Sequence, residues 1–142
     1  MTYYVYTDGA YNRATNTAGC ACIVFTDKRY ITYKLKREDN VSSPSTAETM
    51  AIGMAAGVVL QNIFLLEDDV IEFRVDSKSA LQFISKNLTV EKRYSPVIQS
   101  SLDNIRNLKS KCTLRFTKVR AHKNCVQENT IVDRFAKIAL RG

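Results

Sequence analysis

Three segments near the start of the chain have the residue pattern of β-strands. Residues 3–7 are aromatic or β-branched, residues 19–25 are mostly apolar, and residues 30–35 mix apolar with polar side chains. A polar turn at residues 27–29 joins the second and third segments, as in a β-hairpin. The pattern therefore predicts an antiparallel meander of three strands.

Beyond residue 40 the pattern favours four helices and two further strands. In the helical segments apolar residues return every three or four positions, whereas the two strand segments alternate. The helices are predicted at 44 to about 62, 78 to about 86, 96 to about 108 and about 129 onward, and the strands at 73–75 and 113–119. Ser43, Ser77 and Ser95 stand at helix N-cap positions, and Pro44 and Pro96 suit the first helical position. The 142 residues thus predict one α/β domain without repeats or linkers.

Two of the predicted strands end on an aspartate. Asp8 follows the segment 3–7, and Asp76 follows the strand at 73–75. Open α/β sheets place their chemistry at the carboxyl ends of strands, so we expect the two carboxylates on neighbouring strands, directed at one point. Two carboxylates that share a site at neutral pH require a cation between them.

Two further acids are candidates for the same site. Glu48 lies near the start of the first predicted helix, and Asp133 lies within the last one. Taken alone, Glu48 fits a capping box with Ser45, and Asp133 fits an ordinary surface position. The two strand-end carboxylates favour instead a ring of four acids, in which Asp133 gains a cation as its partner.

Four converging carboxylates repel one another, and divalent ions would relieve that repulsion. Hard oxygen ligands select Mg²⁺ or Mn²⁺ rather than Zn²⁺. Two such ions would activate a water molecule and stabilise the leaving oxygen of a phosphodiester. The acids therefore indicate hydrolysis of a nucleic-acid backbone.

The charge balance agrees with a phosphate-bearing partner. The chain carries 21 Lys and Arg against 14 Asp and Glu, a net charge of +7 with a single histidine. A basic surface without a special partner would explain the same total. The acids assigned to the metal site leave the rest of the surface more basic than this total, which favours nucleic acid.

Other classes of site and location are not indicated. Cys20, Cys22, Cys112 and Cys125 form no Cys-x-x-Cys pair, so we expect ordinary thiols rather than a zinc site. No apolar run reaches the ~18 residues of a membrane span, and no N-terminal segment resembles a signal peptide. The acids at residues 67–69 fit a solvated turn. We expect a reduced, cytoplasmic protein without a membrane partner.

Four motifs resemble type 1 ribonuclease H over nearly the whole length of the chain. They are Tyr6-Thr7-Asp8-Gly9-Ala10, Thr46-Ala47-Glu48-Thr49-Met50-Ala51, Val75-Asp76-Ser77, and Val119-Arg120-Ala121-His122 with Glu128-Asn129 and Asp133-Arg134-Phe135-Ala136-Lys137. Each motif is weak alone, but their order on the predicted elements is specific. The resemblance implies a single ribonuclease H domain over residues 1–142, with a five-stranded mixed sheet of order 3-2-1-4-5 flanked by helices.

The resemblance also implies a role for each site residue. Asp8 would bridge two ions, Asp133 would share the ion that activates water, and Glu48 with Asp76 would hold the other ion. His122 would lie on a mobile loop and assist proton transfer or product departure; a surface histidine is the other interpretation. Contacts to the substrate are expected from Ser45, Thr46, Arg120, Lys123 and Asn129, the last of which would also support the loop or helix start.

Three segments depart from bacterial members of the family. Those enzymes approach the first helix through an asparagine-rich stretch, whereas this chain has Ser43-Pro44-Ser45-Thr46, closer to retroviral and eukaryotic-element versions. The connection at residues 87–94 is too short for the basic protrusion that grips the hybrid in many bacterial enzymes, and Lys92 and Arg93 are its remnant. The loop after residue 119 lacks glycine and is slightly longer, which leaves the role of His122 open.

The expected activity is that of a monomeric endonuclease, dependent on Mg²⁺ or Mn²⁺, that cuts the RNA strand of RNA/DNA hybrids and leaves 5′-phosphate ends. Contacts to the 2′-hydroxyl would distinguish RNA from DNA, and salt would weaken binding. Two alternatives stay open. One is another nuclease of the same fold, such as a junction resolvase, and the other is a catalytically silent nucleic-acid-binding module.

Overall fold

The structure is a computed structural model that describes residues 1–88, 95–119 and 127–142. Its elements are, in chain order, β1 (Thr2–Asn12), β2 (Thr17–Phe25), β3 (Tyr30–Glu38), α1 (Pro44–Asn62), β4 (Val70–Val75), α2 (Lys78–Asn87), α3 (Pro96–Lys111), β5 (Thr113–Lys118) and α4 (Gln127–Arg141). The five strands form one sheet in the order β3-β2-β1-β4-β5. This confirms both the predicted element order and the mixed sheet that the family resemblance implied.

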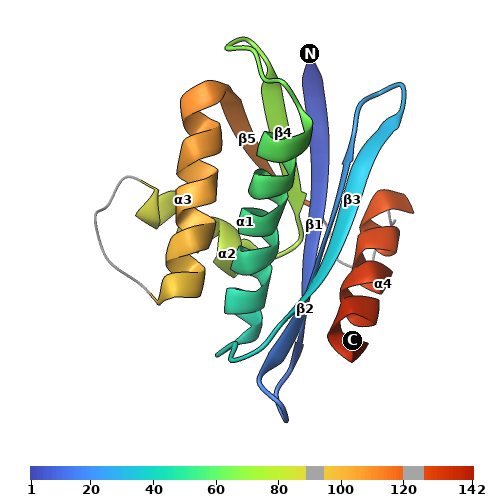
Figure 1. The fold of residues 1–142 in the computed structure, drawn as a ribbon, viewed down its shortest axis with the longest axis vertical. Helices are drawn as coiled ribbons and strands as arrows, with labels where there is room; N and C mark the ends of the chain where they lie inside the picture. Colours follow the sequence, from blue (N-terminus) through green and yellow to red (C-terminus); the bar gives the residue numbers. More distant parts are fainter. Residues whose placement is uncertain (89–94, 120–126) are drawn as a thin grey trace.

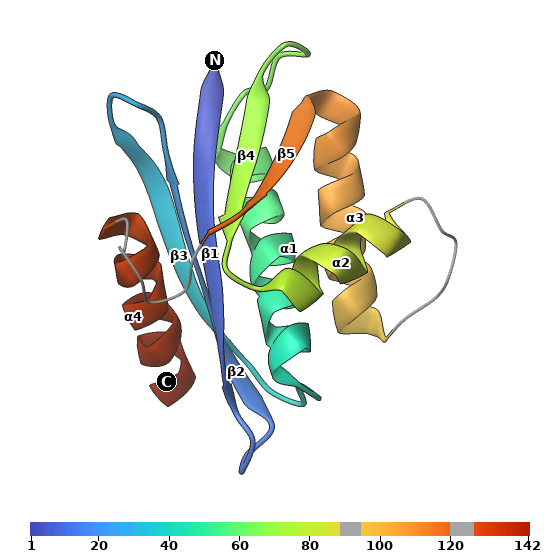
Figure 2. The same ribbon diagram turned by 180° about the vertical axis from the view of Figure 1, so that it is seen from behind.

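Strand β1 lies at the centre of the sheet and divides its side chains between two cores. It pairs antiparallel with β2 and parallel with β4. Val5 packs in the core that α1 covers, whereas the next residue, Tyr6, packs with Val132 and Ala136 of α4. Helices α1, α2 and α3 thus lie on one face of the sheet and α4 on the other (Figures 1 and 2). Alternate residues of β1 consequently face different helices.

The predicted end of the first strand at Asp8 is wrong. β1 continues to Asn12 because its antiparallel pairing with β2 runs on to the pair Asn12 and Thr17. The parallel pairing with β4, by contrast, stops at Thr7 and Val75. Asp8 therefore stands at the point where β1 loses its β4 neighbour, which is the place where Asp76 leaves β4.

Two of the three predicted serine caps are confirmed. The Ser43 hydroxyl accepts a hydrogen bond from the Thr46 N–H at 3.1 Å, and the Ser77 hydroxyl accepts one from the Ala80 N–H at 3.2 Å. Ser95 occupies the N-cap position of α3 without a side-chain hydrogen bond to cap it. Because Ser43 is the cap, the first turn of α1 contains no acid and the capping-box interpretation of Glu48 is wrong.

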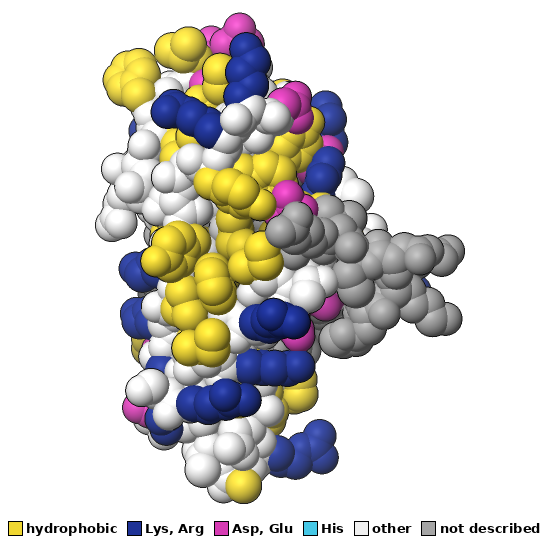
Figure 3. All heavy atoms as spheres, turned by 90° about the vertical axis from the view of Figure 1, so that its right-hand side faces the viewer, with side chains coloured by type: hydrophobic (Ala, Val, Ile, Leu, Met, Phe, Trp, Pro, Cys, Tyr) yellow, Lys and Arg dark blue, Asp and Glu magenta, His cyan; other side chains and the backbone are white. Residues whose placement is uncertain are grey.

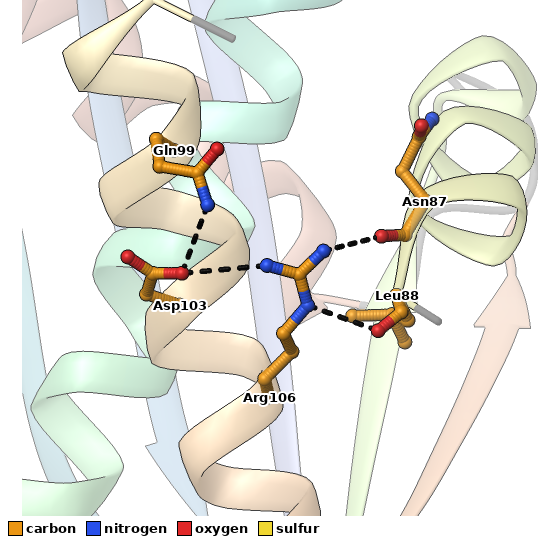
Figure 4. Close-up of polar contacts among 5 residues, drawn as sticks. All are labelled: Asn87, Leu88, Gln99, Asp103 and Arg106. Carbon is orange, nitrogen blue, oxygen red and sulfur yellow. Dashed lines mark hydrogen bonds and ion pairs between the residues drawn. The ribbon is translucent and has the colours of Figure 1, made fainter. Parts of the chain in front are cut away.

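The end of α2 is held by a side chain from α3. Arg106 donates from Nη2 to the Asn87 carbonyl at 2.6 Å and from Nε to the Leu88 carbonyl at 2.9 Å (Figure 4). These are carbonyls at the end of a helix, which lack partners within the helix. Asp103 lies 3.4 Å from Arg106 Nη1 and also accepts from Gln99. The helix that follows Asp76 is thereby fixed against α3.

The acidic turn before β4 departs from its prediction at one residue, whereas Cys20 and Cys22 are the buried thiols that their apolar segment predicted. Asp69 is buried and accepts from the N-terminal ammonium group at 3.1 Å and from the Leu66 N–H at 2.9 Å, so the solvated-turn interpretation is wrong for this residue. Cys20, Cys22 and Cys112 are buried free thiols, and Cys125 lies outside the described residues. Among the described helices, none has both the length and the apolar character that crossing a membrane requires.

Two glycines allow the helices on the two faces to approach the sheet closely. A Cβ atom at Gly9 would lie 2.6 Å from the carbonyl carbon of Ala47 and 2.8 Å from the amide nitrogen of Glu48 in α1. On the other face, a Cβ atom at Gly19 would collide with the Ala136 carbonyl of α4. All of these neighbours are backbone atoms, which cannot rotate away. The two glycines therefore set how close α1 and α4 come to β1 and β2.

We predict that Gly19→Ala destabilises the fold by about 1–3 kcal/mol, because α4 must shift to make room for the methyl group. Gly57→Ala is the matched control. Its nearest neighbour is the side-chain nitrogen of Asn104 at 3.2 Å, and alanine favours the helix by about 1 kcal/mol, so we expect little loss or a small gain. Urea unfolding of both variants measures the difference. Equal stability of the two variants would contradict the close approach at Gly19.

Candidate metal centre

Three acidic side chains meet where β1, β4 and α1 come together. Asp8, Glu48 and Asp76 each offer a carboxylate oxygen, and these oxygens lie within 4.8 Å of one another. Asp8 comes from the middle of β1, Asp76 directly follows β4, and Glu48 lies one turn inside α1. The close contact at Gly9 brings the Glu48 backbone over β1. The structure thus assembles three of the four acids that the sequence indicated.

The fourth acid, Asp133, approaches the same point from α4. Its carboxyl group is close enough to Asp8 to raise the pKa of Asp8 through both hydrogen bonding and charge. Asp133 Oδ2 also accepts a hydrogen bond from Lys137 Nζ at 3.0 Å, one helical turn further along. Asp8 is therefore the acid that interacts with all three of the others.

Burial and mutual repulsion raise the pKa values of the two most enclosed acids. Burial, the largest cause, and the charges of Asp76 and Asp133 raise the pKa of Asp8 from 3.8 to about 7, although a hydrogen bond with Glu48 opposes the shift. Burial, followed by the charge of Asp8, raises the pKa of Glu48 from 4.5 to about 10. Without a cation, Glu48 retains its proton at neutral pH and Asp8 is only partly ionised, because their charged forms lack compensation.

One oxygen of the cluster has no hydrogen-bond partner among the described residues. In the part of the chain that the structure describes, Glu48 Oε2 is buried and forms no hydrogen bond, and the same holds for the neighbouring Thr7 Oγ1. A buried carboxylate oxygen without a partner is costly, and a metal ion satisfies it. The donor set consists of carboxylate oxygens, the ligands that Mg²⁺ and Mn²⁺ prefer. The residues therefore fit a hard divalent cation.

A cross-strand pair fixes the two strands that carry Asp8 and Asp76. Tyr6 and Arg74 stand opposite each other two residues before these acids, and Arg74 Nη1 donates to the Tyr6 hydroxyl at 3.1 Å. Arg74 Nε also donates to Glu72 Oε2 at 2.7 Å. The sequence pattern gives no sign of this pair, since the two residues are 68 positions apart. It does contain a usable signal for Lys137, which lies four residues after Asp133 on a helix.

The remaining predicted residues divide into three groups. Ser45 and Thr46 lie half-buried in the first turn of α1, three and two residues before Glu48. Asn129 is only 6% exposed near the start of α4, a position suited to supporting the helix start rather than to an open contact. Arg120, His122 and Lys123 lie outside the described residues.

We predict that the metal-free fold loses stability as pH rises from about 4 through 7 toward 10. The folded chain keeps protons on Asp8 and Glu48 that the unfolded chain releases, so each group lowers the free energy of unfolding by about 1.4 kcal/mol per pH unit over its own interval. Glu48→Gln removes one such group, so the free energy of unfolding of this variant should fall less steeply with pH. Urea unfolding in EDTA, as a function of pH, measures it.

The matched control for this series is Asp68→Asn, which removes an exposed acid outside the cluster. Saturating Mg²⁺ should restore stability at neutral and higher pH in the wild type, because the ion binds only the deprotonated folded state. Identical pH profiles for wild type, Glu48→Gln and Asp68→Asn would show that no uncompensated acid is buried at this point.

Comparison with known proteins places the chain in a family. No curated protein sequence matches it. Among solved structures, similar ones include the N-terminal RNase H domain of a Mycobacterium tuberculosis protein fused to maltose-binding protein (16% identity, TM-score 0.75, 99% of this chain and 94% of that chain) and RNase H1 of the archaeon Halobacterium salinarum (20%, 0.71, 99% and 98%). LC11-RNase H1, solved in complex with an RNA/DNA hybrid, is also similar (18%, 0.70, 98% and 96%).

These structures share the fold of this chain, and the assignment to a family rests on its sequence. The family model described as RNase H matches residues 1–141, nearly the entire chain. The match includes all four acids of the cluster and every strand of the sheet. The chain therefore belongs to the RNase H family of ribonucleases.

Proposed function

We propose that this protein is a metal-dependent endonuclease that hydrolyses the RNA strand of RNA/DNA hybrids by a two-metal-ion mechanism. The observation that carries the proposal is the convergence of Asp8, Glu48 and Asp76, with Asp133 beside Asp8, in a chain of the RNase H family. The complex of the similar LC11-RNase H1 with an RNA/DNA hybrid supports the choice of substrate.

The position of each acid supports a division of labour. Asp8 interacts with all three other acids, which suits it to bridge two ions; Glu48 and Asp76 would complete one site and Asp133 the other. When bound, the two ions supply an activated water molecule and charge stabilisation at the leaving oxygen. Lys137 Nζ pairs with Asp133 Oδ2 at 3.0 Å and would compete with an ion for that oxygen. Mg²⁺ is the ion we propose, with Mn²⁺ as a substitute.

Recognition of the hybrid would use the surface beside the metal centre. Ser45 and Thr46 in the first turn of α1 lie next to Glu48 in the chain and carry hydroxyl groups suited to the 2′-hydroxyl of RNA. The net charge of +7 favours binding to the phosphate backbone. We assign Arg120 and Lys123 to the same backbone contacts, Asn129 to support of the start of α4, and His122 to proton transfer or product departure. Residues 1–142 would act as a single, monomeric domain.

We predict that the protein cuts an RNA/DNA hybrid in Mg²⁺ and leaves duplex DNA, duplex RNA and a four-way DNA junction intact. Excess EDTA should abolish the cleavage, since the acids alone cannot activate water. Gel analysis of end-labelled strands measures cutting and identifies the ends, which should be 5′-phosphates. Preference for the junction would favour a resolvase. Binding of the hybrid in Mg²⁺ without any cleavage would favour the catalytically silent module.

We predict that Asp76→Asn lowers kcat/KM for the hybrid by about 10²- to 10³-fold, because it removes a charged ligand from a site whose ions contribute several kcal/mol to transition-state stabilisation. Asp68→Asn is the matched control. It removes an exposed acid before β4 and should retain wild-type kcat/KM. Single-turnover cleavage of a short hybrid separates the chemical step from binding. Full activity in the Asp76→Asn variant would mean that the assigned centre is not the active site.

A further inference from the structure

A groove outside the metal centre runs between the edge strand β3 and helix α4. It has a volume of about 350 Å³ and is lined mainly by Tyr30, Tyr33, Ile131 and Phe135. Tyr30 is 57% exposed and Tyr33 is 63% exposed. Figure 3 shows hydrophobic side chains gathered on this face, with Lys and Arg side chains directly below them. A contiguous apolar patch of this kind on a folded domain is typical of a binding surface.

The groove offers aromatic ring faces rather than hydrogen-bonding groups. The rings of Tyr33 and Phe135 are in contact, with centroids 5.4 Å apart, and the Tyr30 hydroxyl donates to Glu128 Oε1 at 3.3 Å. The polar side-chain groups that line the groove are the hydroxyls of Tyr30, Tyr33 and Thr32. A flat, apolar ligand such as a nucleobase suits these walls, and stacking of this kind tolerates any base.

The rim of the groove carries positive charge suited to phosphates. Arg134, Ile138 and Arg141 follow one another at helical spacing along α4, and all three are exposed. Neither of these arginines forms an ion pair with the residues that the structure describes. Across the groove, the exposed Arg37 of β3 points to the same end of α4, where its guanidinium lies near Gly142, and its Nε also pairs with the exposed Asp39 at 3.6 Å. Aromatic faces beside unpaired arginines are the usual combination for single-stranded nucleic acid.

We propose that this groove binds single-stranded RNA that continues from the RNA strand of the hybrid. The proposal rests on the proposed function, since that function brings the RNA strand to the metal centre. Asp133 directly precedes Arg134 on α4, so the rim of the groove begins in the helical turn that carries an acid of the metal centre. A second copy of the chain is a poorer occupant, because a two-fold contact would place Arg134 and Arg141 against the arginines of another chain of charge +7.

The first test measures binding of an RNA of about eight nucleotides, a length typical of single-strand sites, in EDTA, where no cleavage occurs. Fluorescence anisotropy of a labelled oligonucleotide gives Kd and its dependence on salt. Tyr33→Ser should weaken binding about 5- to 100-fold, whereas Tyr33→Phe, which keeps the ring, should bind as the wild type does. The double variant Arg134→Ala/Arg141→Ala should reduce the slope of log K against log salt by about 1.4.

Matched controls distinguish binding in the groove from nonspecific hydrophobic binding and from nonspecific attraction to positive charge. Phe64→Ser removes an apolar side chain that is 89% exposed in the loop between α1 and β4, and Arg13→Ala removes an exposed cation in the turn between β1 and β2. Both should bind RNA as tightly as the wild type. Equal affinities for Tyr33→Ser, Phe64→Ser and wild type, or an unchanged salt slope in the double arginine variant, would overturn the proposal.

The second test links the groove to cleavage. The values of kcat/KM are compared for hybrids with a blunt end, an RNA overhang or a DNA overhang. A hybrid whose RNA strand overhangs at one of its two ends should give the largest value. Tyr33→Ser should abolish that advantage, and Phe64→Ser should keep it. If the wild type cuts no hybrid at all, the proposed function fails, while the binding series in EDTA still decides the groove. A change of oligomeric state in Tyr33→Ser, with RNA binding intact, would identify a self-association surface instead.

Discussion

Buried negative charge at one point of the sheet is the constraint on which the rest of the structure depends. Asp8, Glu48 and Asp133 lie in three different elements and Asp76 directly follows a fourth, and the charges of neighbouring acids disfavour ionisation of Asp8 and Glu48. Burial adds to this repulsion and leaves Glu48 Oε2 without a partner among the described residues. The same arrangement that weakens the metal-free fold therefore gives the site its affinity for divalent cations.

The fold meets this constraint by fixing the elements that carry the acids. Gly9 and Gly19 let α1 and α4 approach opposite faces of the sheet at backbone contact, so Glu48 and Asp133 both reach Asp8. The hydrogen bond between Tyr6 and Arg74 holds β1 and β4 in register two residues before their acids. The acids are thus held by main-chain packing and by strand pairing, which limits how far they can separate when no cation is present.

Features that depend on local sequence were predictable, and those that depend on distant partners were not. The serine caps of α1 and α2 follow from residues three positions apart, so the pattern identified them. The continuation of β1 beyond Asp8 depends on its pairing with β2, and the burial of Asp69 depends on the N-terminal ammonium group, 68 positions away. Periodicity contains no information on either. Glu48 illustrates the intermediate case, because its local sequence fits a capping residue and only the distant acids Asp8 and Asp76 favoured a ligand.

The central claim is that the four acids meet around paired divalent cations. Anomalous diffraction from crystals grown with Mn²⁺ and a hybrid containing a non-cleavable RNA strand tests it most directly. The account predicts two manganese peaks about 3.5–4 Å apart, both in contact with Asp8, one also with Glu48 and Asp76 and the other with Asp133. Crystals that contain the hybrid but show no manganese at Asp8, or show it bound only elsewhere on the protein, would contradict the account.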